Sequence, residues 1–500
     1  MSCIWSTLPA EIRLLILENV INSYEDEENK QNSHPLSKLA VVSNEWQYQI
    51  EKHLFKRLII NQHDIDAFHC IFTDHRRKFP QWVWLRYELP TYGCDVCNLP
   101  ETPADIEANN ASFGRSVEKL FCSLASWTST APSVPKGRLT LELSVHSPSD
   151  KKHFCRELES REYDTAWSYS DPLPVLPLSD RKHGFVRGYR VRELSCTARA
   201  RVYGRPRGMS LSHAATVLRP VPSVGRLVIR RQFYRHFSVS KCLGPILGAL
   251  PALTDFNYEH WRGSMALIDR NIRHQQHRIL FGDVLSKHPT LKRVSVFEDF
   301  QPTYHTHLDS PAQKQLGQKL ARSSRHLEEL HAALNVDARD FFHNFYPGSN
   351  ADIADGLRWG NLRLLSLTSR YLAPESYQSL IKAAAAAAQN MLKLQTMELW
   401  NGHRRGSCIF RYKVVGGQPE IQLLSTWDAE FDHTMTRCWE AVAQLNCPGR
   451  QLISSVGRLD PRYVVGHSTI LRFLELIDRM LNATSLNQIL APTRVVAPKL

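Results

Sequence analysis

A leucine that leads into a short apolar run recurs along the second half of the chain. The five segments begin at Leu253, Leu291, Leu327, Leu362 and Leu394. These leucines are 38, 36, 35 and 32 residues apart, and helical patterns precede several of them, at 281–288, 315–322 and 377–391. A helix–strand unit of this size cannot bury its apolar face alone, so neighbouring units must stack on one another.

This pattern resembles a divergent leucine-rich-repeat array, which implies a solenoid of parallel strands backed by helices. The repeats are longer than the usual length of about 20 to 29 residues. Two earlier strands, at 82–87 and 139–145, are expected in the same sheet. A conventional α/β domain with parallel strands explains the same pattern and remains the alternative. We assign residues 61–405 to this irregular, leucine-rich-repeat-like α/β region.

The pattern changes after residue 405. Two apolar runs separated by a Gly-Gly pair predict a β-hairpin over 408–427, and helical patterns follow at 433–445 and 467–481. Residues 406–500 are therefore expected to form a C-terminal α+β subdomain that caps the repeat-like region. The fold class predicted for the whole chain is α/β or α+β.

The first sixty residues predict three short helices. The first, over 9–21, is apolar on two sides. An acidic, polar loop is expected at 23–34, followed by a second helix at 36–42 and a third that Ser43 caps. Three helices this short make too small a core to cover all their apolar residues, so a partner-binding face is expected. The competing interpretation is that the helices cap the domain that follows.

The order and spacing of residues in these helices resemble the F-box. The matching pattern is Leu8-Pro9-x-Glu11-Ile12 with Ile16-Leu17, then Leu36-x-x-Leu39-Ala40-x-Val42-Ser43 and Trp46. The resemblance implies that residues 1–60 dock on the Skp-family adaptor of an SCF (Skp-cullin-F-box) ubiquitin ligase. The loop at 23–34 is longer and more acidic than the usual connection. With its repeat-like middle and C-terminal region, the chain is similar to F-box proteins of filamentous fungi.

The function implied by this resemblance is a non-catalytic, substrate-recruiting subunit of a cullin-based ubiquitin ligase. The repeat-like region would bind the target protein, and other subunits would perform catalysis on the target held near them. The residues expected to contact the adaptor are Leu8, Pro9, Ile12, Leu15, Ile16, Leu39, Val42 and Trp46.

The positive charge of the chain is concentrated in residues 181–235. The chain has 62 Lys and Arg against 49 Asp and Glu, and this segment alone accounts for the net charge of +13. The arginines expected to form a basic patch are Arg187, Arg190, Arg192, Arg199, Arg201, Arg205, Arg207, Arg230, Arg231 and Arg235. Such a patch would favour an acidic or phosphorylated target. Because aromatic residues lie between the arginines, the alternative function is a nucleic-acid or chromatin-associated scaffold.

Cys94 and Cys97 have the spacing of half a zinc site, but no second Cys or His pair lies at the expected distance. His69 and His75 are candidates only if the fold brings them close, and two ordinary thiols are the preferred interpretation. The sequence contains no phosphate-binding loop, nucleophile elbow, metalloprotease motif or dinucleotide fingerprint. We therefore expect no catalytic residue, no cofactor and no metal.

The eleven cysteines are scattered, and the start of the chain has no signal-peptide pattern. These features predict a reducing compartment, the cytoplasm or the nucleus. The longest uncharged stretch near the middle, 242–253, is broken by Gly and Pro and is shorter than the ~20 residues of a membrane helix. No association with a membrane is expected.

Overall fold

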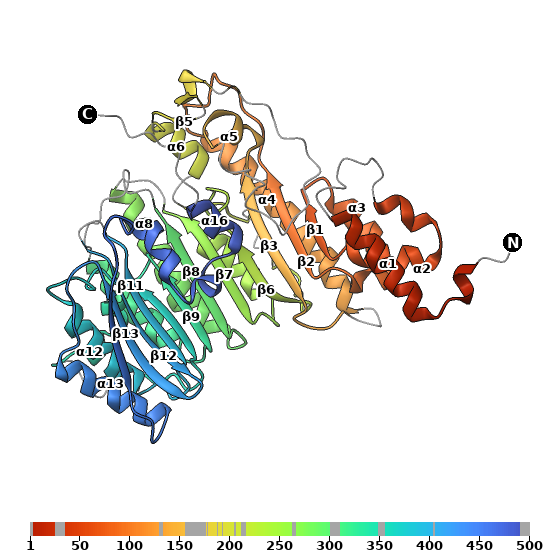
Figure 1. The fold of residues 1–500 in the computed structure, drawn as a ribbon. Helices are drawn as coiled ribbons and strands as arrows, with labels where there is room; N and C mark the ends of the chain where they lie inside the picture. The colour runs from red at the N-terminus through yellow and green to blue at the C-terminus, as the bar shows by residue number, and fades with distance from the viewer. Residues whose placement is uncertain are drawn as a thin grey trace.

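One large, open, mostly parallel sheet organises the described part of the chain (Figure 1). The computed structural model describes residues 4–25, 36–129, 134–155, 177, 179–187, 189–192, 194–204, 207–211, 217–262, 267–300, 311–348, 356–403 and 406–490. The fold is mixed α/β, as predicted. No helix among these residues is long and apolar enough to cross a membrane.

The strands of the large sheet lie in the order in which they follow one another along the chain. They are β1 (Arg57–Ile60), β2 (Trp82–Glu88), β3 (Leu139–His146), β6 (Val224–Ile229), β7 (Asp255–Trp261), β8 (Arg293–Asp299), β9 (Glu329–Ala333), β10 (Leu364–Thr368), β11 (Thr396–Asn401), β12 (Cys408–Val415), β13 (Gln418–Ser425) and β14 (Ile453–Arg458). Neighbours are parallel from β1 to β11. Strand β12 is antiparallel to β11 and β13, and β14 runs parallel to β13. A separate two-stranded ribbon pairs β4 (Phe185–Val186) with β5 (Tyr189–Arg190).

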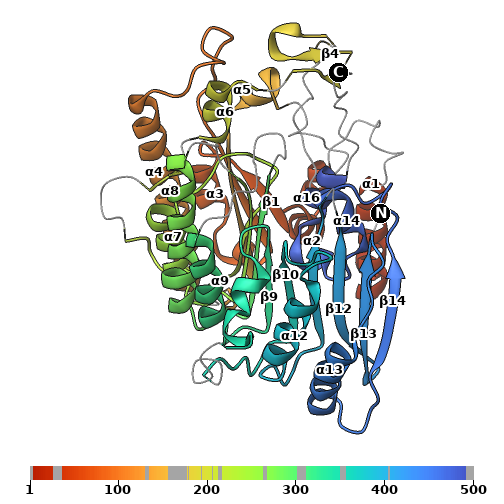
Figure 2. The same ribbon diagram turned by 90° about the vertical axis from the view of Figure 1, so that its left-hand side faces the viewer.

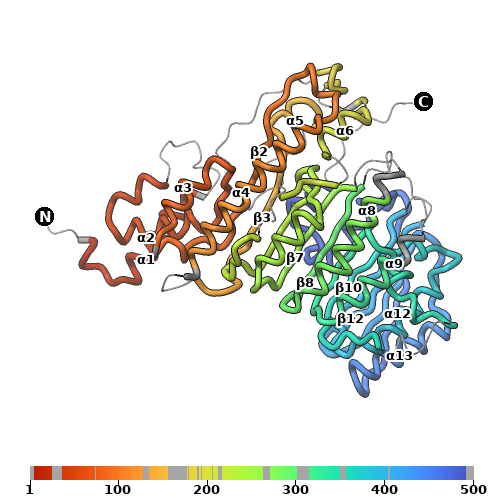
Figure 3. Tube along the Cα trace, turned by 180° about the vertical axis from the view of Figure 1, so that it is seen from behind, coloured from red at the N-terminus to blue at the C-terminus, as the bar shows by residue number. Residues whose placement is uncertain are grey.

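One face of the sheet is covered by helices from the connections between strands (Figures 2 and 3). These helices include α3 (Ile65–Ile71), α4 (Pro103–Ser129), α7 (Gly244–Gly248), α8 (Leu267–Ile279), α9 (Pro311–Ser323), α10 (Ala338–Phe341), α12 (Tyr377–Ala388) and α13 (His433–Asn446). Side chains alternate across the pleat, so each strand sends every second residue into the apolar core under the helices. Phe256 and Tyr258 of β7, and Val294 and Val296 of β8, belong to this core.

The recurring leucines lie at equivalent places in the fold. Each of the five is buried two residues before its strand, from β7 to β11. The backbone carbonyl of the next residue accepts hydrogen bonds from the following unit: Thr254 O from Lys292 N–H and Arg293 N–H, and Lys292 O from Glu328 N–H and Glu329 N–H. The same contact recurs at Glu328 and Arg363. These backbone hydrogen bonds join consecutive units just before the residues at which their strands begin to pair.

The predicted hairpin is confirmed as β12 and β13. Gly416 and Gly417 have φ angles of 56° and 82°. A two-residue hairpin turn requires such positive φ values, which glycine adopts at little cost. Because β12 pairs with β11, the boundary expected at residue 405 does not separate two sheets.

The second face of the sheet is covered by a C-terminal segment, defined here as residues 467–490 (Figure 1). It contains α14 (His467–Ile470), a 3-10 turn (Leu471–Phe473), α15 (Ile477–Met480) and α16 (Ala483–Leu490). The single helix predicted at 467–481 is therefore wrong. Leu474 is extended, and the N–H groups of Glu475 and Leu476 donate to the Glu398 carboxylate of β11, at 2.9 and 3.2 Å, instead of to helix carbonyls.

Shorter helices make up the N-terminal region and the insertion between β3 and β6. The N-terminal elements are a 3-10 turn (Ile4–Thr7), α1 (Ala10–Glu25), a 3-10 helix η3 (Leu36–Val41) and α2 (Asn44–Leu54). The second predicted helix is thus of the 3-10 type, and α1 extends into the start of the predicted loop. The rest of that loop, from residue 26, lies outside the described residues. The insertion contributes α5 (Pro148–His153), a 3-10 turn η7 (Arg181–His183) and α6 (Cys196–Tyr203).

Candidate functional site

The N-terminal helices pack around a small core of their own. Ile21, Leu36 and Ile50 are buried in it, and Leu39 and Trp46 pack against it. The Arg13 guanidinium of α1 pairs with the Glu45 carboxylate of α2, and the Trp5 indole donates to the same carboxylate. These hydrogen bonds lower the pKa of Glu45. Ser43 caps α2 as predicted, because its side chain accepts from the Trp46 N–H at 3.3 Å.

The same helices also expose large apolar side chains. We name Ile12, Leu14, Leu15, Ile16, Val41 and Val42 the exposed apolar set. Leu15 is 54% exposed, Val42 58% and Val41 88%. Solvent exposure of this kind, on helices that already have a core, is typical of a surface that binds a partner.

The eight residues expected to contact an adaptor divide into two groups. Pro9, Ile12, Leu15, Ile16 and Val42 are exposed, whereas Leu8, Leu39 and Trp46 are half-buried. Leu39 and Trp46 serve the internal packing of the helices. Sequence reasoning missed Leu14 and Val41. Leu14 lies on the helical stripe of Leu17 and Ile21, which are both buried, and no pattern selected Val41.

Helix α2 fixes these helices to the sheet. The Arg76 guanidinium, in a 3-10 turn (Asp74–Lys78) before β2, donates two hydrogen bonds to Glu51 at 2.6 and 2.9 Å. Burial raises the pKa of Glu51, but the hydrogen bonds from Arg76 and Gln47 outweigh it and leave the pKa lowered. Tyr48 packs edge-on against Phe79, with Lys78 above the Tyr48 ring. Strand β1 follows directly and pairs with β2.

Four of the ten arginines of the predicted basic patch are buried and cannot belong to a surface patch. Arg230 pairs with Glu142 at 2.5 Å, Arg231 with Asp299 at 2.7 Å and Arg235 with Glu101 at 2.6 Å. Arg201 donates to the carbonyls of Leu99 and Pro100. The sequence shows the arginines together but not the carboxylates that the fold brings to them. The other members are exposed or half-buried: Arg187, Arg192, Arg199 and Arg207. The Arg190 side chain and Arg205 lie outside the described part of the structure.

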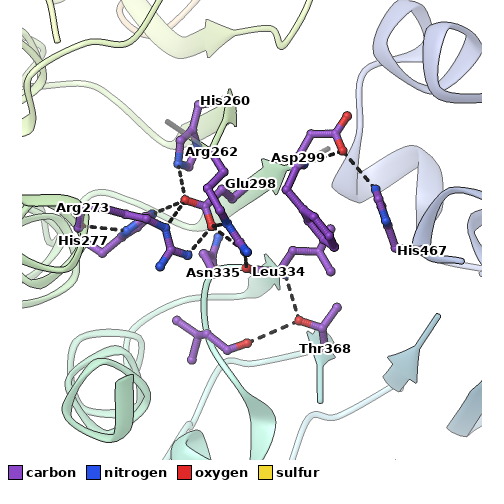
Figure 4. A network of polar contacts seen from close by, with 12 residues as sticks. His260, Arg262, Arg273, His277, Glu298, Asp299, Leu334, Asn335, Thr368 and His467 are labelled. Carbon is purple, nitrogen blue, oxygen red and sulfur yellow. Dashed lines mark hydrogen bonds and ion pairs between the residues drawn. The ribbon is translucent and has the colours of Figure 1, made fainter. Parts of the chain in front are cut away.

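A buried polar network lies where β7 and β8 end (Figure 4). The Glu298 carboxylate pairs with Arg262 at 3.0 Å and with Arg273, and His260 lies 3.5 Å from it. Burial raises the pKa of Glu298, but the charges of Arg273 and Arg262 outweigh it and hold that pKa well below its usual range. His260, His277 and Glu298 are close enough to share a metal ion. The two guanidinium groups already neutralise the carboxylate, so this network is a structural ion-pair cluster.

The Cys94–Cys97 pair meets two histidines that the sequence analysis did not select. They are His153 of α5 and His183 of η7. The two candidates it named lie elsewhere: His69 contacts Ser123 at 3.2 Å, and His75 lies 3.9 Å from Glu51. No local pattern pointed to His153 and His183, since they are 59 and 89 residues from Cys94.

Comparison with known proteins gives one match. The model of a family of unknown function (DUF6546) matches residues 286–482, which run from the 3-10 turn Leu285–Lys287 before β8 to the residues just after α15. No curated protein and no solved structure matches the chain.

Proposed function

We propose that the chain is a substrate-recruiting F-box subunit of an SCF-type ubiquitin ligase, and that α1 and η3 bind the Skp-family adaptor. The observation that carries the proposal is the exposed apolar set on helices that have a separate internal core. Exposed leucine, isoleucine and valine at a partner interface contribute through burial on binding, at about 25 cal/mol per Å² of apolar area. The order of the helical elements also agrees with the F-box pattern.

The sheet supports a scaffold role for the rest of the chain. Equivalent buried leucines and equivalent inter-unit hydrogen bonds recur from β7 to β11. This regularity favours a divergent leucine-rich-repeat-like solenoid over a conventional α/β domain. Such an array would hold the target protein at a fixed distance from the adaptor-binding helices, since Glu51 and Arg76 tie these helices to the first strands. An acidic or phosphorylated target remains compatible with the exposed Arg187, Arg192 and Arg207.

The burial of Arg201, Arg230, Arg231 and Arg235 removes the main support for the nucleic-acid alternative. Phosphate binding needs accessible cations, and these four guanidinium groups are occupied by carboxylates and carbonyls. We therefore do not propose a nucleic-acid function.

Co-purification of the full chain with a Skp-family adaptor tests the proposal. The test variant is Leu15→Asp with Val42→Asp, which places two charges in the exposed apolar set. We expect its affinity for the adaptor to fall at least about tenfold, because a charge at an apolar interface is left without a partner. The matched control is Leu392→Asp, since Leu392 is 62% exposed in the connection before β11, far from α1 along the chain.

The result supports the proposal if wild type and Leu392→Asp bind while the double variant, with an unchanged circular dichroism spectrum, does not. Failure of the wild-type chain to bind any Skp-family adaptor would overturn it. Equal binding by the double variant and the wild type would overturn the assignment of the surface.

A further inference from the structure

Four side chains from three distant segments come together where the insertion contacts the turn after β2. Cys94 and Cys97 lie in a turn after β2, His153 ends α5, and His183 ends η7. The Cys94 Sγ lies 3.6 Å from His153 Nδ1 and 3.7 Å from His183 Nε2. The Cys97 Sγ lies 3.7 Å from the same His183 Nε2. Cys97, His153 and His183 are buried, and Cys94 is at the surface.

The hydrogen bonds around the two imidazole rings show which nitrogen of each ring is protonated and which points an unprotonated lone pair into the cluster. His183 Nδ1 lies 2.6 Å from the Asp180 carboxylate, and His153 Nε2 lies 3.3 Å from the Tyr92 carbonyl. An ionised carboxylate and a carbonyl only accept, so both of these nitrogens carry the proton. In neutral rings, His153 Nδ1 and His183 Nε2 are then both unprotonated, yet they lie 3.1 Å apart. Two lone pairs in this arrangement repel unless a proton or a metal ion lies between them.

The distances among Cys94, His153 and His183 agree with tetrahedral coordination of one ion, and their ligand atoms all lie within 4.8 Å of one another. Cys97 lies outside this group of three: its Sγ is near His183 Nε2, but it must come closer to the other ligand atoms to complete a set of four. Zinc bonds of about 2.3 Å to sulfur and about 2.0 Å to nitrogen, at a tetrahedral angle, place sulfur and nitrogen about 3.5 Å apart. The same geometry places two nitrogens about 3.3 Å apart. The observed separations are 3.6 and 3.7 Å for the sulfur–nitrogen pairs and 3.1 Å for the nitrogen pair.

We propose that Cys94, Cys97, His153 and His183 bind one Zn²⁺ ion in a structural site. Two thiolates and two imidazoles form a ligand set that zinc prefers over harder divalent cations. Asp180 and the Tyr92 carbonyl orient the two rings, and the Asn98 side-chain amide donates to the Cys97 Sγ at 3.7 Å. Four protein ligands leave no open position for a substrate. This proposal is independent of the adaptor-binding function.

The ion would fasten the insertion to the sheet. Cys94 and His183 are 89 residues apart, and the cluster joins the end of β2 to α5 and η7. Beside it, Trp84 of β2 packs with Phe154, Val202 and Phe233. Arg201 of α6 lies over the Tyr92 ring, and that ring stacks on His153. Apolar packing at Trp84 and ring contacts at Tyr92 therefore already hold the insertion against the turn after β2, next to the four proposed ligands.

Metal analysis of the full-length protein, purified without a metal-chelating tag, tests the proposal. Elemental analysis should find about one zinc per chain. Cys97→Ser and His183→Ala should each remove the bound zinc, and Asp180→Asn should weaken zinc affinity by about 10- to 100-fold while keeping all four ligands. The control is Cys196→Ser, because Cys196 is exposed in α6 of the same insertion and should leave the zinc content unchanged.

Substitution of Co²⁺ for zinc provides a readout that needs no variant. A tetrahedral site with two thiolates gives intense visible ligand-field bands and a sulfur charge-transfer band, whereas an octahedral or oxygen-bound ion does not. The proposal is supported by one zinc per wild-type chain together with the tetrahedral thiolate spectrum. It is overturned by zinc-free protein from zinc-replete expression, by an octahedral spectrum, or by full zinc retention in the Cys97→Ser, His183→Ala double variant.

Discussion

At the scale of single residues, the ion pair at Glu298 shows how the fold uses its buried charges. The Glu298 side chain is 1% exposed and those of Arg262 and Arg273 are 15% and 16% exposed. Removing one partner of a buried pair leaves uncompensated charge, which costs more than the pair itself contributes. We predict that Glu298→Gln lowers the free energy of unfolding by about 3 kcal/mol, measured by urea denaturation.

A surface ion pair provides the control for this prediction. Asp66 and Lys119 pair at 2.9 Å with side chains 78% and 58% exposed. Asp66→Asn is expected to lower the free energy of unfolding by less than about 1 kcal/mol, since water solvates both charges when the pair is lost. Equal losses in the two variants would contradict a structural role for the Glu298 network.

His277 makes stability depend on pH. Burial lowers the pKa of His277 well below its usual range, although Glu298 opposes this shift. The folded chain therefore keeps His277 neutral, while the unfolded chain protonates it below a pKa of about 6.5. The stability that the neutral His277 ring contributes is fully present above about pH 6.5 and is lost as the pH falls towards the lowered folded-state pKa.

We predict that His277→Gln loses less of its free energy of unfolding between pH 7 and pH 5 than the wild type does. Urea denaturation of both chains at the two pH values measures the difference. Between pH 7 and pH 8 the two chains should change in parallel, because His277 is then neutral in both the folded and the unfolded state. An identical decline towards pH 5 would show that the ring is charged in the folded protein.

At the scale of elements, the buried leucines before β7 to β11 hold each unit against its neighbour. Leu327 is 1% exposed and belongs to the core under the helices. We predict that Leu327→Ala lowers the free energy of unfolding by about 2 to 5 kcal/mol, because the deletion leaves a cavity. Leu392→Ala removes the same atoms from an exposed side chain and should cost less than about 0.5 kcal/mol. Similar urea midpoints for the two variants would contradict this role.

These elements could be predicted because their signals are local. Each leucine lies two residues before its strand, and the Gly416-Gly417 turn directly joins the two strands of its hairpin. The partners of Cys94 and of Arg230 could not be predicted in the same way, because His183 and Glu142 reach them across 89 and 88 residues. The break in the helix predicted at 467–481 likewise depends on Glu398, a distant strand residue that accepts the backbone N–H groups of that segment.

At the scale of the whole molecule, both faces of the sheet are covered. In the solenoid architecture proposed above, the face opposite the helices is the one that often binds ligands. Here the C-terminal segment occupies much of that face: Ser295 Oγ donates to the Met480 carbonyl at 2.7 Å, and Asn482 N–H donates to Glu259 at 2.6 Å. Nearer β2, the insertion with α5 and α6 packs on Trp84. A recruited target would therefore contact other surfaces of the chain.

Hydrogen–deuterium exchange of the full chain tests whether the C-terminal segment is part of the core or a removable cover. Arg230, Glu259 and Glu398 are buried beneath it and hydrogen-bond to it, so its departure would leave three charged groups without these partners. We predict that peptides from 467–490 whose amides bond to the sheet exchange nearly as slowly as β8. Strand β14, an edge strand with mostly exposed residues, should exchange faster and serves as the internal comparison. Fast exchange of 467–490 beside a slow β8 would mean that the segment opens independently, and the covered face would then become the first place to look for the target.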